Sequence, residues 1–454
     1  MSAAIAAAPG RSANRLIFHA AGAVLVAGAV VKIASTGKEF VLAGIYGRSD
    51  VIDAFLAAFL IPNLLINLIA ESMNQALLPT LIRVRIREGH ERAQQLLSSS
   101  MLWMCGLLIA VSLAMAAGAR AIFPLIASGF APGKLDLSVH LFYALLPVVL
   151  LTGIATNCTA VLNSLDRFAA PALAQLAVPI AIVAGAILLH DRYGIWALVY
   201  ATLIGAAVHA AFVGSLMSRR GYRFALTWHG SNQATQEVAG QYGPVLLSSL
   251  VASGGLLVDQ AMAAMLPAGS VSALVFANRF VSVVVTLMAG ALSSALTPHF
   301  STMVARGNWE ECRGTLRTWS VAMAAISVPI TALLIIGAQP LVRVTLQHGA
   351  FGPSDTAVVK SVLAMYAIQI PFFVVSRVFY RFVLAMRRTD VILCCGLLNL
   401  GLDIGLNFVL MRWFGIAGIA LATSLWSIST LAFLWYWAMK LLHSADTDRK
   451  EAHA

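Results

Sequence analysis

Residues 170–190 read APALAQLAVPIAIVAGAILLH, a run of membrane-spanning length without a single Asp, Glu, Lys or Arg. A helix that crosses a bilayer needs about 20 consecutive apolar residues, whereas β-barrel strands are about ten residues long and alternate strictly. The whole chain has this character: 60% of its 454 residues are hydrophobic, 11% are charged, and its mean hydropathy is +0.85. Soluble domains carry roughly a quarter charged residues. The sequence therefore predicts an all-α integral membrane protein.

Eleven further apolar runs of similar length bring the prediction to about twelve transmembrane helices. The first run follows Arg11 and Arg15, as in a signal peptide, but no clear small-residue cleavage site comes after it. We therefore interpret it as a retained first helix. The predicted spans are 16–34, 51–82, 98–124, 139–164, 170–190, 194–216, 240–265, 270–298, 318–342, 357–385, 390–411 and 415–441.

The net charge of +11 is unevenly distributed between the loops. If the N-terminus is cytoplasmic, about 18 Lys and Arg residues lie in cytoplasmic segments and about 7 in the opposite loops. Cytoplasmic loops of membrane proteins are enriched in Lys and Arg. We therefore predict that both termini are cytoplasmic. The basic charge then reflects orientation and contact with anionic lipids, and it does not indicate a nucleic-acid partner.

The chain also repeats itself at an offset of about 220 residues, in three separate stretches. Six spans separate equivalent points, so both halves enter the membrane in the same direction. The prediction is two parallel six-helix lobes, 1–216 and 241–454, joined by a cytoplasmic linker at 217–240, with a short cytoplasmic tail. The matching stretches are Ala76–Thr80 with Ala295–His299, Leu165–Arg167 with Met386–Arg388, and Gly194–Ala197 with Gly415–Gly418.

Several ionisable or amide side chains interrupt the apolar runs. Each charge at the bilayer centre costs about 2.5–3.5 kcal/mol, so such groups persist when they pair or line a polar path. We interpret them as a cavity with surplus cations that bind phosphate oxygens. Internal ion pairing, for example of Lys32 with Asp259 or Glu71, is the alternative. The candidate cavity residues are Lys32, Lys38, Arg279, Asp53, Glu71, Asn63 and Asn67.

Further intramembrane groups fit other roles. Asp259 and Asp403 are candidate coupling acids of the second half. Arg377 and Arg381 share one helix face, where they either line the cavity or extend toward the membrane surface. His209 stands alone in an apolar context, which favours a buried core histidine.

The sequence lacks the motifs of an ATP-driven pump or an enzyme. It contains no phosphate-binding loop, no metal signature and no nucleophile–base arrangement. We therefore expect a transporter without a cofactor, powered by the membrane potential or by a coupling cation, Na⁺ or H⁺. A negative interior drives an anion outward by about 2.3 kcal/mol per charge per 100 mV.

Several short motifs occur in both halves of the chain: Gly47, Asp53–Phe55, Ala58–Leu65, Ala70-Glu71, Ala76–Pro79, Phe276–Arg279 and Leu296–Pro298. With these motifs the chain resembles the MurJ/MviN lipid II flippases of the multidrug/oligosaccharidyl-lipid/polysaccharide exporter superfamily. The resemblance covers roughly residues 30–440.

This resemblance implies a V-shaped pair of six-helix lobes around a cationic cavity. It also implies a cargo, an undecaprenyl-pyrophosphate-linked saccharide, flipped from the inner to the outer leaflet of a bacterial inner membrane by alternating access. Lys32 and Lys38 stand where the family has arginines, Asp53 and Glu71 match its acids, and Arg279 matches its second-lobe arginine. Membrane lipids and glycan-synthesis proteins would be the partners.

The chain departs from the family pattern at several positions. Ile66 and Asn67 replace arginine, and Ser72 replaces a glycine. The sequence ends after about twelve spans, whereas lipid II flippases usually add two helices. A related polysaccharide repeat unit fits as cargo equally well. Two other hypotheses are a cation-coupled drug antiporter of the same superfamily and a scaffold for a glycan-synthesis complex.

Overall fold

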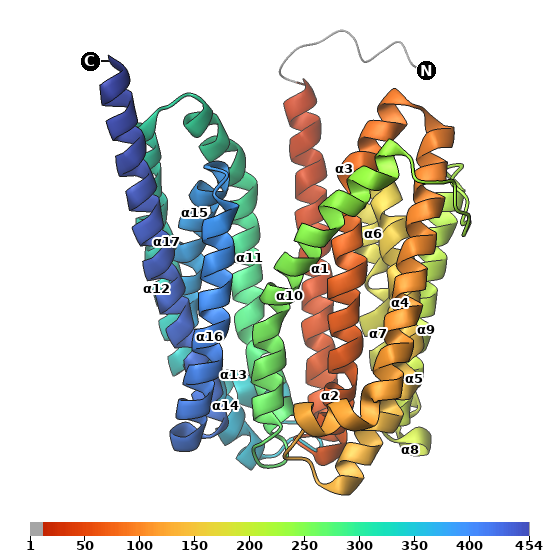
Figure 1. The fold of residues 1–454 in the computed structure, drawn as a ribbon. Helices are drawn as coiled ribbons and strands as arrows, with labels where there is room; N and C mark the ends of the chain where they lie inside the picture. The colour runs from red at the N-terminus through yellow and green to blue at the C-terminus, as the bar shows by residue number, and fades with distance from the viewer. Residues whose placement is uncertain (1–11, 454) are drawn as a thin grey trace. The chain divides into compact units, whose positions relative to one another are not determined.

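The computed structural model describes residues 12–453, except for the side chains of 12–25, 252, 291, 293–295, 298 and 446–453. These residues form helices and connecting coil, and no strand occurs among them (Figure 1). The elements are α1 Ser12–Tyr46, α2 Asp50–Leu65, the π-helix η1 Ile66–Glu71, α3 Ser72–Arg87, α4 His90–Ile126, α5 Pro132–Ser164, α6 Ala169–Ala174, α7 Ala177–Leu188, α8 His190–Tyr193, α9 Trp196–Ser218, α10 Gln233–Ala263, α11 Ser270–Ala305, α12 Trp309–Ile336, α13 Ala338–Leu346, α14 Pro353–Ala367, α15 Gln369–Ala385, α16 Thr389–Phe414 and α17 Ile416–His453.

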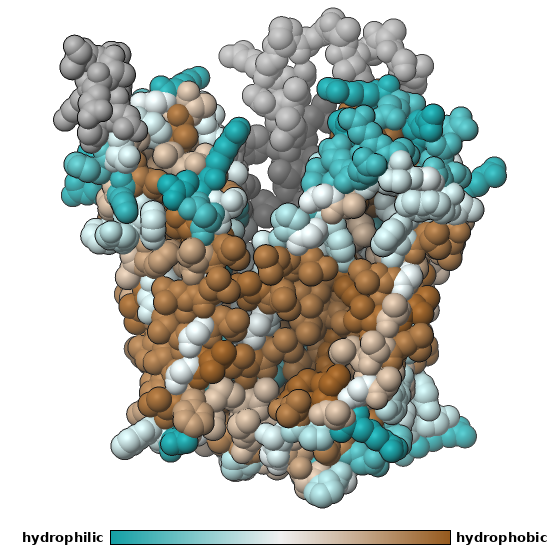
Figure 2. Space-filling model, viewed as in Figure 1, coloured by the Kyte–Doolittle hydropathy of each residue, from teal (hydrophilic) through white to brown (hydrophobic). Residues whose placement is uncertain are grey.

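Eleven helical segments of the described chain are long and apolar enough to cross a membrane. They correspond one to one to the second through twelfth predicted spans, and α1 contains the first. Some segments combine several elements; Asp50–Arg87, for example, joins α2, η1 and α3. Hydrophobic side chains cover the middle of these helices, and hydrophilic ones gather at their ends (Figure 2). The all-α membrane fold predicted from composition is confirmed.

The internal repeat is visible in the backbone. Asp166 and Arg387 are the two non-glycine residues with positive φ in the described chain, at +59° and +57°. They lie 221 positions apart, inside one of the matching stretches. Gly194 and Gly415, also 221 apart, end their helices with nearly identical angles (φ 55°, ψ −129° and φ 56°, ψ −134°). Such conformations are costly for most residues, so their recurrence at one offset supports a duplicated helical unit.

Contacts within the chain define two compact units. Unit 1 comprises residues 1–38, 62–116 and 143–246, and unit 2 comprises 39–61, 117–142 and 247–454. Two segments of the first half, 39–61 and 117–142, thus have most of their contacts with the second half. Of the predicted linker, residues 219–232 form coil and the remainder belongs to α9 and α10.

Unit 1 packs closely where α7 meets α9. Gly205 of α9 lies against Val178 and Ala181 of α7, and a Cβ atom at position 205 would come within 2.8 Å of the Val178 Cα atom. Small residues at such crossings let helix backbones approach, which drives association where no water is present. This contact fixes α9, and with it His209, relative to α7.

Unit 2 has its core around α15 and α17. Helix α15 contacts α11, α12 and α17, and α17 also contacts α14 and α16. Phe300 of α11 and Phe382 of α15, both fully buried, meet edge to face with ring centroids 5.8 Å apart. These contacts pack α11, α14, α15, α16 and α17 together in unit 2.

Candidate functional site

A π-helical turn places Glu71 in a polar cavity of unit 1. The turn, η1, interrupts the long helix between α2 and α3, a few residues after Pro62. Proline removes a backbone donor, and π-turns inside α-helices occur frequently at functional sites. The Asn67 amide donates to the Asn63 carbonyl at 2.9 Å within the same helix. Glu71 lines the cavity, whereas Asn63 and Asn67 are not among its lining residues.

The cavity has a volume of about 370 Å³ and a mostly polar wall. Four residues of α5, spaced by four, three and four positions, present one helix face to it. The Nε2 atom of His209 and the Oδ1 atom of Asn74 are buried and have no hydrogen-bond partner among the described residues. The lining residues are Glu71, Asn74, Thr152, Thr156, Thr159, Asn163, Gln175, Val178 and His209.

The composition of this wall limits what it can bind. It contains hydroxyls, amides, one imidazole and one carboxylate, but no Lys or Arg. Phosphate groups are usually bound by Arg or Lys. Donors and acceptors in this mixture suit a hydroxyl- or amide-bearing group instead. Sequence reasoning missed Asn74, His209 and the α5 residues, although the spacing of Thr152, Thr156, Thr159 and Asn163 was a readable signal.

Lys32 and Lys38 lie on α1 within unit 1, and both side chains are half-buried. Neither lines the cavity around Glu71. Both take part in polar or electrostatic interactions with other parts of the protein. Their role as cargo-binding cations stays a prediction.

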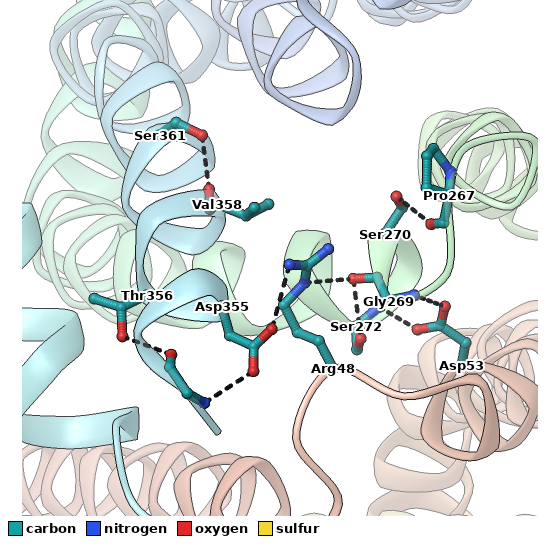
Figure 3. A network of polar contacts seen from close by, with 11 residues as sticks. Arg48, Asp53, Pro267, Gly269, Ser270, Ser272, Asp355, Thr356, Val358 and Ser361 are labelled. Carbon is teal, nitrogen blue, oxygen red and sulfur yellow. Dashed lines mark hydrogen bonds and ion pairs between the residues drawn. The ribbon is translucent and has the colours of Figure 1, made fainter. Parts of the chain in front are cut away.

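In unit 2, the Asp53 carboxylate caps the start of α11 (Figure 3). Its oxygens accept hydrogen bonds from the backbone N–H groups of Gly269 and Ser272, both at 2.8 Å, and it pairs with Lys134 Nζ at 3.1 Å. Gly269 adopts a φ of +78°, and a Cβ atom there would lie 2.8 Å from the Arg48 Cβ atom, so glycine is required. A carboxylate at a helix N-terminus satisfies free N–H groups and complements the helix dipole.

Arg48 extends the same network. Its Nε atom donates to the Gly269 carbonyl at 2.9 Å, and its guanidinium pairs with Asp355 at 3.4 Å (Figure 3). The Ala350 N–H donates to the Gly44 carbonyl at 2.8 Å beside it. Residues 44–53 are thus held against the starts of both α11 and α14. Sequence reasoning identified Asp53 but not its backbone partners Gly269 and Ser272, which lie 216 and 219 positions away.

Arg279 of α11 forms an ion pair with Glu39 at 3.0 Å. Glu39 is 1% exposed, and the neighbouring rings of Phe40 and Phe280 stack with centroids 5.3 Å apart. Internal pairing was the alternative to a cavity cation for this arginine. The Arg279 side chain is still 36% exposed, so pairing and cargo contact are compatible.

Asp259 and Asp403 converge with two polar residues inside unit 2. The Asn407 amide donates to Asp259 at 2.8 Å and to Asp403 at 3.3 Å, and the Thr423 hydroxyl donates to Asp259 at 3.5 Å. All four residues are at least nine-tenths buried. The Asp403 Oδ2 and Asn407 Oδ1 atoms have no hydrogen-bond partner among the described residues.

Two buried carboxylates this close are stable together only when a proton or a cation shares their charge. The donor set is all oxygen, which suits a hard cation or a proton and not a transition metal. The predicted coupling acids are therefore neighbours, with unsatisfied oxygens between them.

Arg377 of α15 lies over the Phe373 ring at 4.1 Å and near the Tyr380 ring at 5.5 Å. Arg381 approaches the Tyr380 ring at 5.6 Å. Cation–π contacts of this kind stabilise a guanidinium that has left water. These contacts are compatible with both predicted roles of the arginines, lining the cavity and extending toward the membrane surface.

Solved structures define the class of protein first. A multidrug resistance MATE transporter of the MOP superfamily, solved facing inward, superimposes with a TM-score of 0.79 at 13% identity over 94% of this chain and 99% of the transporter. A lipid II flippase MurJ in an inward closed conformation gives 0.78 at 20% identity, over 92% and 87%. These likenesses show that the chain shares its fold with these solved membrane transporters.

Sequence relationships then identify the family. The family profile described as lipid II flippase MurJ matches residues 42–450, so the chain belongs to the MurJ family. A probable lipid II flippase MurJ of Buchnera aphidicola is 25% identical over 396 residues, which cover 86% of this chain and 77% of the relative. The lipid II flippase MurJ of Burkholderia cenocepacia is 25% identical over 350 residues, covering 74% and 67%. The resemblance inferred from the Asp53–Leu65 region is confirmed.

Proposed function

We propose that this protein flips a lipid II-type precursor, a saccharide linked to undecaprenyl pyrophosphate, from the inner to the outer leaflet of a bacterial inner membrane. Membership of the MurJ family across residues 42–450 carries this proposal. The two-lobe transporter fold and the intramembrane cations support it. Both termini are assigned to the cytoplasm, because about 18 Lys and Arg residues fall on that side against about 7 on the other.

The parts of the cargo would meet different groups. Lys32, Lys38 and Arg279 are assigned to the pyrophosphate, since cations bind phosphate oxygens. The cavity around Glu71 is assigned to the sugar, because its wall is rich in hydroxyls and amides and lacks Lys and Arg. Replacement of family arginines by lysine and by Ile66 and Asn67 would weaken bidentate phosphate binding, so a related polysaccharide unit is the second cargo to test.

Alternating access is proposed as the mechanism. The contacts of Arg48, Asp53 and the Gly44 carbonyl fasten residues 44–53 of the first half to α11 and α14 of the second. All of these contacts lie within unit 2, so they hold residues 44–53 in that unit. Asp259 and Asp403 would bind the coupling cation, Na⁺ or H⁺, whose release changes the charge inside unit 2.

Single substitutions of Lys32, Lys38 and Arg279 by Ala test the cargo assignment. We expect each to lower flipping of a polyprenyl-pyrophosphate saccharide in proteoliposomes by about tenfold or more, because a charge-assisted hydrogen bond contributes about 1.5–3 kcal/mol. The exposed Lys360, which bonds to Gln339, supplies the control change Lys360→Ala. If all three variants keep full activity, the cations do not bind the cargo; cation-coupled drug efflux that depends on the acids would then be favoured.

A further inference from the structure

The coil that joins α9 to α10 lies along the outside of α4 (Figure 1). The Gly221 carbonyl contacts the His90 ring at 3.2 Å, and the Gln94 side chain forms two hydrogen bonds with the backbone of Arg223, at 2.8 and 2.9 Å. The Trp228 ring then meets the Trp103 ring with centroids 6.1 Å apart. From position 90 to position 103, α4 rises about 20 Å, a distance that residues 221–228 span only when nearly extended.

This docked segment turns large apolar side chains outward. Phe224, Leu226 and Trp228, at alternate positions, are 49%, 46% and 47% exposed, and Trp103 beside them is 63% exposed. Tyr222, at the start of the segment, is buried against His90. The segment is therefore held against α4 from Gly221 to His229 while its large apolar side chains stay exposed.

Positive charge accompanies these apolar side chains. Arg219, Arg220 and Arg223 are exposed, and none of them forms an ion pair in the described part of the chain. Tryptophan and arginine together are typical of the boundary between headgroups and acyl chains. Basic segments near a membrane are attracted to anionic lipids.

The span predicted from hydropathy places Trp103 near that boundary. Trp103 lies five residues inside the span 98–124 predicted from hydropathy, about 7.5 Å along the helix. Trp228 contacts it and so lies at a similar depth. This prediction puts the linker coil at the membrane boundary, in contact with α4.

We propose that residues 219–229 form a membrane-surface anchor, in which Phe224, Leu226, Trp228 and Trp103 insert at the level of the headgroups while Arg219, Arg220 and Arg223 bind the phosphates of anionic lipids. Interfacial segments of this kind bind through their apolar area plus attraction to anionic lipid. The anchor would keep the link between the halves at a constant depth during transport. It does not depend on which cargo the protein carries.

Spin labels on the full-length protein test the anchor. Four of the five cysteines are buried and Cys394 is exposed, so a Cys394→Ala background permits labelling of Leu226→Cys and, as a matched control, Thr227→Cys. The proteins are reconstituted in phosphatidylcholine with or without phosphatidylglycerol. We expect the label at 226 to collide more with oxygen than with a water-soluble nickel chelate, and the label at 227 to show the reverse.

Phosphatidylglycerol should move the label at 226 deeper, and the combined Arg219→Gln, Arg220→Gln and Arg223→Gln variant should abolish that shift. Equal water accessibility of both labels in phosphatidylglycerol vesicles would overturn the anchor. If the label at 226 lies equally deep with and without phosphatidylglycerol, the assignment of the anchor to anionic lipid would be overturned. Burial of the label only after addition of a soluble protein would identify a protein-docking surface instead.

Discussion

At the scale of single residues, Asp53 caps the start of α11 and also matches an acidic residue of the MurJ family pattern. Its carboxylate accepts two backbone hydrogen bonds at the start of α11 and pairs with Lys134 while being 1% exposed. Asp53→Asn removes the negative charge of the side chain. It also places the amide NH2 group, itself a donor, against the backbone N–H donors of Gly269 and Ser272. Since charged hydrogen bonds contribute about 1.5–3 kcal/mol each, we expect a loss of about 3 kcal/mol. The thermal unfolding temperature of the purified protein measures it.

Asp50→Asn is the matched control. Asp50 pairs with the same Lys134, at 2.7 Å, but its side chain is 60% exposed. Exposed ion pairs contribute about 0–1 kcal/mol, so this change should scarcely move the unfolding temperature. Equal losses of unfolding temperature in the two variants would show that capping of α11 by Asp53 adds no stability beyond that of an exposed ion pair.

Asp259 and Asp403 carry the coupling prediction. Asp259→Asn or Asp403→Asn removes one of two buried like charges, so the folded protein should be as stable as the unmodified one or more stable. Transport measured against external Na⁺ and pH should lose its dependence on the coupling ion. Asp136→Asn, at an exposed side chain, is the control. Unchanged ion dependence in both variants would contradict a cation site between these acids.

Sequence alone located the intramembrane charges but not their partners. Lys32, Asp53, Glu71, Arg279 and Asp403 are visible because a charge stands out in an apolar run. Their partners are set by folding: Glu39 pairs with Arg279, and Asn407 with Asp259, across 240 and 148 positions. No periodicity encodes such distances, so these pairings required the structure.

At the scale of elements, the polar face of α5 is the feature that hydropathy concealed. Thr156→Val together with Thr159→Val removes two hydroxyls from the cavity with little change in volume. If the cavity binds sugar, the apparent KM for the cargo should rise about fivefold per hydroxyl, in line with about 1 kcal/mol per hydrogen bond. Flipping rates at varied cargo density measure this.

The control for this change is Thr202→Val on α9, whose hydroxyl bonds to the Leu198 carbonyl of its own helix. It should leave the KM unchanged. A double α5 variant with unchanged KM would remove the cavity around Glu71 from the cargo path.

Spans and repeats were predictable at this scale for clear physical reasons. Bilayer thickness sets the length of apolar runs, and duplication preserves positions such as Gly194 and Gly415 that need unusual backbone angles. The π-turn at Ile66–Glu71 was not predictable, because it depends on how the helix adjusts after Pro62. Glu71, the last residue of that turn, lines the cavity, whereas Asn63 and Asn67 before it do not.

At the scale of the whole molecule, family membership and the internal chemistry support one account. The chain belongs to the MurJ family, and its intramembrane groups divide into cations, a sugar-compatible cavity and an acidic pair. In the proposed function, these groups would bind the phosphate, the saccharide and the coupling ion, respectively. The family profile over residues 42–450 establishes the family, and measurement of transport tests the proposed cargo.

The most direct measurement is exposure of cargo on the outer leaflet of cells depleted of their own lipid II flippase and supplied with this protein. An impermeant enzyme that cleaves the exposed headgroup reports the fraction flipped. The account predicts that cleavage returns with the unmodified protein and is lost with Lys32→Ala or Arg279→Ala at equal expression. A well-expressed, folded protein that leaves the precursor entirely on the inner leaflet would contradict it.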